Sequence, residues 1–153
     1  MARRSSAERQ KIRGARARTA GEGIQISVRE LDERLFEEFL VLYADTVNRM
    51  RHGVNVALEE RDTILADRSS YIALCASSGA RLVGCCLARR EPALDTVRVR
   101  FSAADHPHRE TSLARVLYME AGRVTRELEH RTLSLGKDRN LYGHIAKPGL
   151  LRF

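Results

Sequence analysis

Residues 71–88 read YIALCASSGARLVGCCLA, two compact apolar runs on either side of a short polar spacer. The first run covers 71–76 and the second covers 82–88, and both have the composition of buried strands. The spacer Ser77-Ser78-Gly79-Ala80 has the composition of a tight turn. The stretch therefore predicts an antiparallel hairpin, and we expect a domain built around a sheet.

The sequence after this hairpin predicts a strand, a long helix and a further strand. Residues 96–101 alternate in polarity, so we expect Val97, Val99 and Phe101 on one face of a half-buried strand. Between residues 113 and 128, apolar residues recur at steps of three and four, as they do on the buried side of an amphipathic helix. Residues 132–135 then predict a short strand. A strand, a crossover helix and a strand in this order predict two parallel strands.

Two helices are expected before the hairpin. Ser27-Val28-Arg29-Glu30 has the spacing of a capping box, so we expect a long helix to begin here and to end at Gly53. Asn55 is expected to cap a shorter helix that contains Leu58 and Ile64. The complete order is α-α-β-β-β-α-β, which predicts a mixed-sheet α/β domain over residues 24–153.

Positive charge is concentrated at the N-terminus of this basic chain. The 153 residues carry a formal charge of +7, and residues 1–23 alone contain seven Arg or Lys residues and two Glu residues. This basic leader lacks apolar periodicity, so we expect it to be disordered in isolation. The sequence has no apolar run of membrane-spanning length and no secretory signal, and we therefore expect a cytoplasmic protein.

Cysteine and histidine spacings predict neither disulfides nor a metal site. Cys75, Cys85 and Cys86 are odd in number and two are adjacent, so we expect reduced core residues. His106 and His108 lie in a His-Pro-His sequence that has no carboxylate or thiolate at a spacing suited to zinc.

Four further segments resemble a known family in their order and spacing. They are FLVLYADTVNR at 39–49, LYMEA at 117–121, TLSLG at 132–136 and NLYGHIAKPGL at 140–150. Together they resemble the GNAT-type domain of the Fem-type aminoacyl/peptidyl transferases and of the related bacterial BioF-like acetyltransferases, over about residues 25–153. The resemblance implies an N-acyltransferase of GNAT fold that acts on a primary amine of a small molecule or peptide. It implies acetyl-CoA, another acyl-CoA or aminoacyl-tRNA as the donor.

Two features of the sequence differ from the usual GNAT pattern. Acetyl-CoA-dependent GNAT enzymes resemble one another in a glycine-rich loop before the long helix, whereas residues 104–112 read ADHPHRETS, without glycine and with Pro107. This composition argues against an ordinary pyrophosphate cradle. GNAT domains also continue past this point with closing strands. A truncated chain, a homodimer or partner chain that completes the sheet, and half of a duplicated architecture are the alternatives.

Residues on either side of the predicted sheet are candidates for binding. Arg49 and His52 lie near the end of the first long helix, where the resemblance implies substrate-binding residues. His106, His108 and Arg109 precede the second long helix, and we expect them to contact an anionic donor at its N-terminus.

The C-terminal segment is the candidate for catalysis. Asn140, Tyr142 and Lys147 are expected to bind substrate, because ligands of α/β sheets gather beyond the carboxyl ends of parallel strands. His144 or Asp138 is expected to accept the proton of the amine. The competing interpretation is that this segment is a structural turn.

Two functions of other classes stay open. The first is an RNA-binding protein whose basic leader contacts phosphate, although the chain has only four Phe and four Tyr residues to stack on bases. The second is a non-catalytic partial GNAT domain that acts as a partner subunit, because an unpaired sheet edge pairs readily with another chain.

Overall fold

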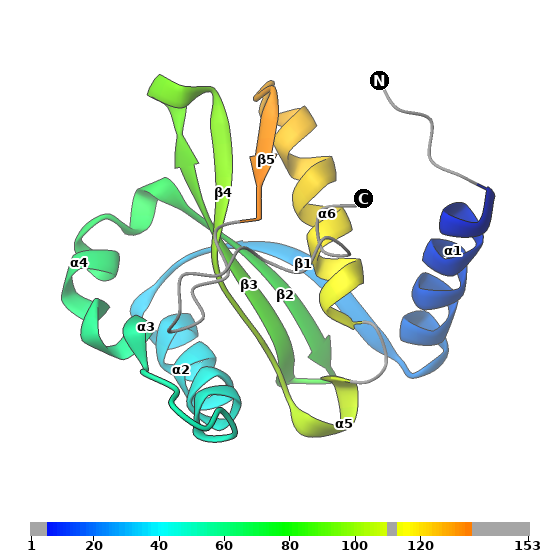
Figure 1. The fold of residues 1–153 in the computed structure, drawn as a ribbon, viewed down its shortest axis with the longest axis horizontal. Coiled ribbons are helices and arrows are strands. Elements are labelled where there is room, and N and C mark those ends of the chain that lie inside the picture. The colour runs from blue at the N-terminus through cyan, green and yellow to red at the C-terminus, as the bar shows by residue number, and fades with distance from the viewer. Residues whose placement is uncertain (1–5, 110–112, 136–153) are drawn as a thin grey trace.

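The computed structural model describes residues 6–109 and 113–135, and a five-stranded mixed sheet forms its centre (Figure 1). The strands lie in the order β1 (Ile24–Glu30), β2 (Tyr71–Ser78), β3 (Arg81–Glu91), β4 (Thr96–Ala104) and β5 (Thr132–Ser134). The first four pair antiparallel with their neighbours, and β5 pairs parallel with β4. The predicted mixed α/β fold, its hairpin and its parallel strand pair are confirmed.

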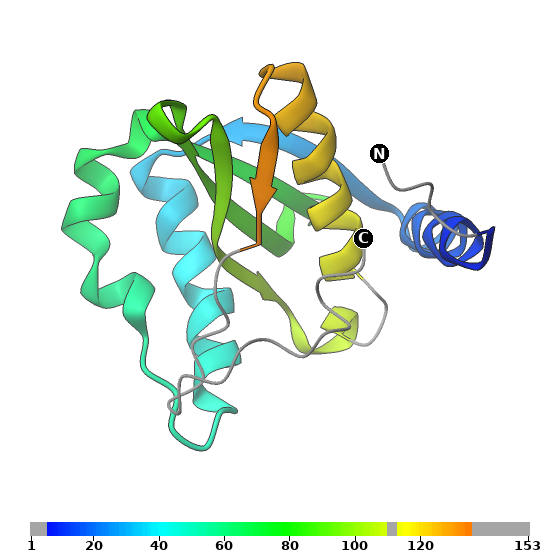
Figure 2. The same cartoon turned by 45° about the horizontal axis from the view of Figure 1, so that its top comes forward.

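Helices cover both faces of the sheet (Figures 1 and 2). One face carries α2 (Glu33–Asn48), α3 (Val56–Glu59) and α4 (Arg61–Ala66), and the other carries α6 (Leu113–Glu127). The short helix α5 (His106–Arg109) follows β4, and two 3-10 turns are η1 (Arg68–Ser70) and η2 (Pro92–Leu94). In the described part of the chain, no helix combines the length and apolar character that crossing a membrane requires.

The described N-terminal residues form a helix, α1 (Ser6–Gly21), which lies beside α6 and β1. The composition of residues 1–23 predicted disorder. The structure differs because Ala15 and Thr19 are buried where α1 packs on the rest of the domain. Tertiary contacts of this kind supply stability that a short polar helix lacks by itself. The division of the chain into a leader of residues 1–23 and a domain of residues 24–153 stays a prediction.

The segment predicted to open the first long helix is instead the edge strand β1, so the prediction of a capping box at Ser27 was wrong. Asp32 caps the helix, and its Oδ1 accepts a hydrogen bond from the amide of Leu35 at 2.7 Å. The prediction that α2 ends at Gly53 was also wrong, because the helix ends at Asn48 and Arg49 is its C-cap. The predicted cap at Asn55 is confirmed, with its Oδ1 2.9 Å from the amide of Leu58.

A β-bulge in β4 moves the side chains that follow it to the opposite face of the sheet from the one that regular alternation predicts. Leu87 of β3 pairs with Phe101, and the next residue Ala88 pairs with Val99, which leaves Arg100 as the extra residue. Val97 and Val99 therefore pack in the core beneath α6, whereas Phe101 packs with α2. The simple alternation predicted from the sequence fails at Phe101 for this reason.

Close packing positions the start of α6 on the sheet. Gly84 of β3 lies so near this helix that a Cβ atom there would be 2.8 Å from Cδ2 of Leu113. Leu113 and Leu117 are fully buried, so the side chains that contact Gly84 have little room to move. The absence of a side chain at Gly84 thus sets where α6 begins relative to the end of β4.

Candidate active site at the divergence of β4 and β5

The pairing of the two parallel strands lies just before the bulge. β5 pairs with β4 from Thr96 to Arg98, and β4 then continues through Arg100 to Ala104. Figure 1 shows β4 running past the described end of β5 toward α5. Ligands of sheets with crossover helices gather beyond the carboxyl ends of the parallel strands, so this part of β4 is the candidate site.

An ion-paired cluster occupies the α2 side of the bulge. Arg100 donates through Nη2 to Oε2 of Glu60 at 2.7 Å, and its guanidinium carbon lies 5.3 Å from the centre of the Phe101 ring. The Phe101 ring in turn meets the ring of Tyr43 edge-on at 5.6 Å. Glu60 is the residue at which α3 ends and α4 begins, and this break presents its side chain toward the bulge.

The phenol of Tyr43 is held in its protonated form. Burial raises its pKa above the usual value, and the negative charge of Glu60 raises it further. At neutral pH, the cluster therefore contains a neutral phenol that can donate a hydrogen bond, near the carboxyl group of Glu60.

Two of the predicted binding residues contact each other at the end of β4. The guanidinium of Arg49, at the end of α2, lies 2.8 Å from Nδ1 of His106, at the start of α5. Asp45 lies 3.4 Å from the same guanidinium. Both Arg49 and His106 are exposed, so they place a cation and an imidazole at the rim beside the loop that leads to α6.

His108 has acidic surroundings. Its Nδ1 contacts Oδ1 of Asp105, and its Nε2 lies 3.8 Å from Oε2 of Glu22. Arg81 approaches the other oxygen of Asp105 at 3.2 Å. A contact between His108 and a phosphate stays a prediction, and these two carboxylates oppose it.

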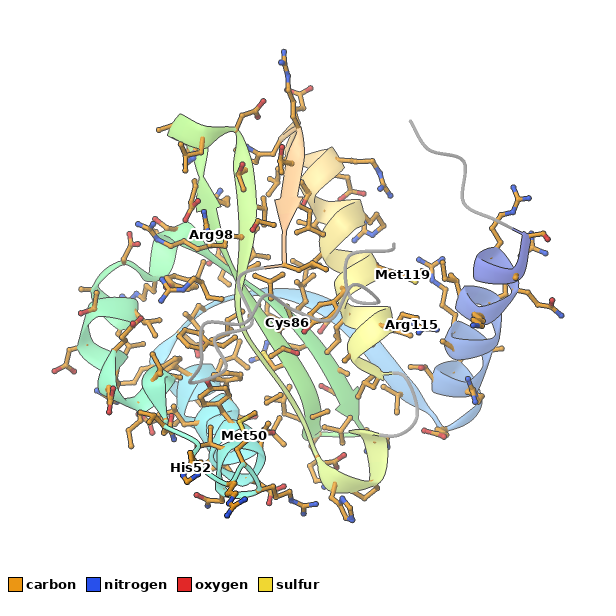
Figure 3. All side chains as sticks on the ribbon, viewed as in Figure 1. Met50, His52, Cys86, Arg98, Arg115 and Met119 are labelled. Carbon is orange, nitrogen blue, oxygen red and sulfur yellow. The ribbon has the colours of Figure 1, made fainter. Side chains whose placement is uncertain are left out.

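The other predicted residues are not brought into these contacts. His52 is exposed in the turn after α2 (Figure 3). Asp138, Asn140, Tyr142, His144 and Lys147, and the side chain of Arg109, lie outside the described residues. Cys75, Cys85 and Cys86 are free and buried, as predicted. No group of three or more potential metal ligands occurs in the described part of the structure.

Sequence reasoning missed Glu60 and Arg100. A pairing between residues forty positions apart has no local signature, and the break at Glu60 falls inside a segment that resembles one helix. The regular alternation of residues 96–101 places Arg100 on the polar face of the strand, so Arg100 itself gives no signal of the pairing.

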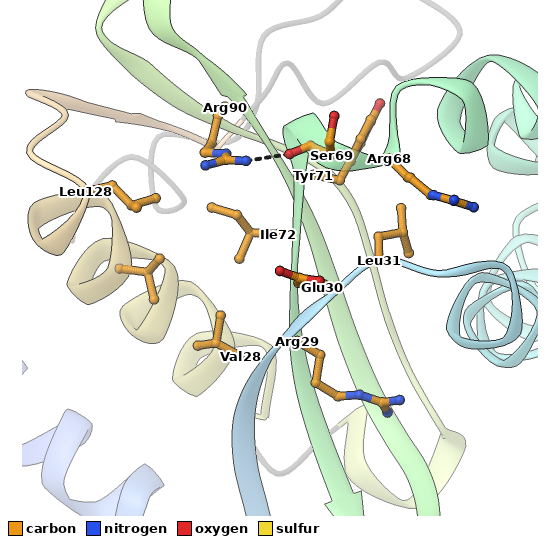
Figure 4. A pocket seen from close by; sticks show the side chains of 11 residues that line it. Val28, Arg29, Glu30, Leu31, Arg68, Ser69, Tyr71, Ile72, Arg90 and Leu128 are labelled. Atoms are coloured by element: carbon orange, nitrogen blue, oxygen red, sulfur yellow. Dashed lines mark hydrogen bonds between the residues drawn. The ribbon is translucent and has the colours of Figure 1, made fainter.

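A separate cavity of about 470 Å³ lies between the end of α6 and the start of β2 (Figure 4). Ile72, Val124 and Leu128 form an apolar wall, and Arg68 and Arg90 contribute positive charge. Arg90 donates a hydrogen bond to the carbonyl oxygen of Ser69. This cavity contains neither the bulge nor the Arg49 and His106 pair.

Solved structures resemble this fold along most of the chain. The ribosomal-protein-alanine N-acetyltransferase of Brucella melitensis biovar Abortus 2308 matches with a TM-score of 0.56 and 22% identity, over 82% of this chain and 93% of that one. An aminoglycoside acetyltransferase from an uncultured soil metagenomic sample, in complex with sisomicin, matches with a TM-score of 0.61 and 12% identity, over 78% and 80%. The PaiA N-acetyltransferase of Thermoplasma acidophilum, in complex with coenzyme A, matches with a TM-score of 0.54 and 10% identity, over 69% and 75%.

These likenesses show that the chain has the GNAT acetyltransferase fold. No protein-family model matches the sequence, and no curated protein matches it either. The resemblance to the Fem-type and BioF-like subgroup stays a prediction, since the three structures named here are N-acetyltransferases and aminoglycoside acetyltransferases.

Proposed function

We propose that the protein is an N-acyltransferase that transfers an acetyl group from acetyl-CoA, or a related acyl group, to a primary amine. The observation that carries this proposal is the Arg100 bulge with its Glu60 ion pair, which directly follows the parallel pairing of β4 with β5 within a GNAT fold. Support for acyl-CoA as the donor comes from the fold neighbour solved with coenzyme A. Aminoacyl-tRNA has no corresponding support among the structures named above.

The residues at the end of β4 suit the anionic part of such a donor. Arg49 and His106 lie at the rim beside the loop that leads to the N-terminus of α6, a helix of 15 residues. A helix N-terminus favours negative charge, and an arginine fork binds phosphate through charge-assisted hydrogen bonds. This arrangement supplies positive charge without the glycine-rich loop that the sequence lacks.

The helical layer that would face the acceptor amine, formed by α2, α3 and α4, is acidic. Residues 32–67, which include α2, α3 and α4, contain nine Asp or Glu residues and four Arg residues. The resulting field attracts a protonated amine toward the sheet. This supports a cationic acceptor, such as an amino sugar or a peptide with a free amino group.

The bulge cluster supplies acid-base groups for the transfer. An acyl-CoA provides an activated thioester carbonyl, whose carbon–sulfur bond breaks as the amine nitrogen bonds to the carbonyl carbon. Glu60 accepts the proton that the amine must lose, directly or through one water. Tyr43 keeps its proton at neutral pH and can donate a hydrogen bond to the reacting groups. His144 and Asp138 stay alternative proton acceptors, and Asn140, Tyr142 and Lys147 stay proposed substrate contacts.

Mass spectrometry of amines incubated with acetyl-CoA and the full chain tests the function. We expect a product heavier by one acetyl group. Glu60→Gln should lower kcat by about a hundredfold or more, with little change in CoA affinity. Glu59→Gln, an exposed neighbour in α3, is the matched control and should be nearly silent.

The pH profile separates a chemical role of Glu60 from a structural one. Loss of a proton acceptor abolishes the acidic limb of kcat against pH, whereas loss of the Arg100 ion pair alone leaves this limb in place. Full activity of Glu60→Gln together with loss of activity in His144→Ala assigns the proton transfer to His144. An absence of both CoA binding and acetylated product across a panel of amines overturns the proposed function.

A further inference from the structure

Helix α1 carries cations for which the rest of the described structure provides no counter-ion. Its exposed basic residues are Arg9, Lys11, Arg13, Arg16 and Arg18. Among the described side chains, which do not include that of Glu8, none of the five forms an ion pair. By contrast, most of the arginines that do form ion pairs, such as Arg61 and Arg123, contact carboxylates on neighbouring turns or helices. The charge on α1 is therefore uncompensated by the fold.

The five cations form two rows along the helix. Arg9, Arg13 and Arg16 are four and three positions apart, so they share one side of α1. Lys11 and Arg18 are seven positions apart and share the opposite flank. The surface between the rows is made of small residues, and a Cβ atom placed on Gly14 would meet no atom within 4 Å.

Like charges at this spacing oppose the helix that carries them. Each such pair destabilises an isolated helix by about 0.2–0.5 kcal/mol. A polyanion laid along α1 removes this repulsion and releases the counter-ions of its own phosphates. The row from Arg9 to Arg16 is about 10 Å long at 1.5 Å per residue, which allows contact with more than one phosphate of a strand.

The buried side of α1 distinguishes a nucleic acid from a membrane. Ala15 and Thr19 are buried where the helix packs beside α6, so its apolar positions are already used. A helix that binds a membrane surface needs a free apolar face to insert. Four of the five cations are arginines, whose planar guanidinium groups bind phosphate oxygens in pairs.

The chemistry of α1 also indicates contacts with the backbone only. The helix contains no aromatic side chain to stack on bases, and Gln10 is its only side-chain amide. A helix that reads a duplex does so with side chains that reach base edges, and α1 offers only Gln10 for this. We propose that α1 is a docking surface for single-stranded nucleic acid, which it binds through phosphates and without sequence preference.

The position of α1 keeps the proposed docking surface away from the acidic helices α2, α3 and α4. α1 and the helices α2–α4 lie on opposite sides of the molecule in both ribbon views (Figures 1 and 2). Figure 3 shows Arg115, an exposed residue of α6, on the side of that helix nearest α1. A polyanion is therefore attracted at α1 and repelled at the proposed acceptor side.

Fluorescence anisotropy with the full chain tests the proposal. The probes are 20-nucleotide oligo(U) and oligo(dT), measured across a series of salt concentrations. We expect similar affinities for both, because phosphate contacts ignore the sugar and the base. The logarithm of the binding constant should fall with the logarithm of salt concentration with a slope of about −3, from about 0.7 per phosphate contact.

The decisive variant replaces three arginines in one row. Arg9→Gln, Arg13→Gln and Arg16→Gln together should reduce the magnitude of this slope by about 2. The matched control has the same net charge and replaces three exposed arginines elsewhere, Arg34→Gln, Arg68→Gln and Arg131→Gln. The control should keep the slope of the original chain.

Three outcomes overturn the proposal. The first is an equal loss of binding in the two triple variants, which indicates attraction by net charge alone. The second is binding to vesicles of anionic lipid without binding to either oligonucleotide. The third is an absence of binding at low salt by a chain whose helix content, measured by circular dichroism, matches that of the structure. Glu60→Gln should leave oligonucleotide binding unchanged, so the result is independent of the proposed transferase activity.

Discussion

The guanidinium of Arg49 donates a hydrogen bond to Nδ1 of His106 over 2.8 Å, although 57 positions separate the two residues. A guanidinium can only donate, so Nδ1 must present its lone pair and the ring proton must be on Nε2. This contact ties the end of α2 to the segment that follows β4. Arg49 and His106 thus connect two elements of the proposed site, α2 and α5.

Removal of this guanidinium should weaken the binding of CoA. We expect Arg49→Gln to raise the dissociation constant about tenfold, since hydrogen bonds to charged groups contribute about 1.5–3 kcal/mol. Isothermal titration calorimetry with CoA provides the measurement. Arg34→Gln, on the same helix and 87% exposed, should bind CoA normally. Unchanged affinity of Arg49→Gln would show that the donor does not reach this rim.

A methyl group at Gly84 should disturb the start of α6. Gly84→Ala brings Cβ to 2.8 Å from Leu113, and overpacking of this kind costs about 1–3 kcal/mol of unfolding free energy. Urea denaturation of this variant, of Leu113→Ala and of the double variant gives the coupling free energy between the two positions. The double variant should lose less stability than the two losses added together. Gly14→Ala, with open space around it, is the control and should not destabilise the chain.

Asp67 should stabilise the fold in a manner that depends on pH. Hydrogen bonds from Ser70 and then from Arg89 lower the pKa of this carboxyl group. A lowered pKa means that the folded state binds protons less readily than the unfolded one. The contribution is therefore present above the ordinary aspartate pKa, near 4, and is lost as the pH falls through the folded-state value.

Urea denaturation of the original chain and of Asp67→Asn checks this dependence. The difference in unfolding free energy should be largest near pH 7 and should shrink toward pH 3. A difference that is constant with pH would contradict an ionised role for Asp67. Asp62→Asn, whose side chain is 99% exposed, is a suitable control.

The cysteines should be inert in the folded protein. Burial raises the pKa of Cys86 to about 12, and a hydrogen bond with Cys75, followed by burial, raises the pKa of Cys85. The same hydrogen bond lowers the pKa of Cys75, but this side chain is fully buried and so is shielded from reagents. The thiolate is the reactive form, so a disulfide reagent at pH 8 should modify these thiols slowly until the chain unfolds. Release of chromophore after addition of denaturant should account for three thiols. Rapid stoichiometric reaction of the native chain would show that one of them is accessible.

Local patterns in the sequence predicted the hairpin, α6 and the parallel pairing of β4 with β5, because each depends on apolar spacing within one segment. They failed at Ser27, because residues 24–30 pair with β2 as a strand and the helix is capped by Asp32 instead. The α1 helix was missed for a related reason, since its order depends on contacts with α6. The contact of Arg49 with His106, and that of Glu60 with Arg100, depend on the tertiary fold and have no sequence signature.

The bulge at Arg100 has a consequence for the number of residues that β4 needs. Val99 and Phe101 already face opposite sides of the sheet, so a chain that lacks Arg100 would alternate regularly and keep both side chains in their present cores. Packing alone is therefore satisfied by one residue fewer. The additional residue instead places the guanidinium of Arg100 against Glu60, so the core packing of this strand and its contact with the α3–α4 junction are separable.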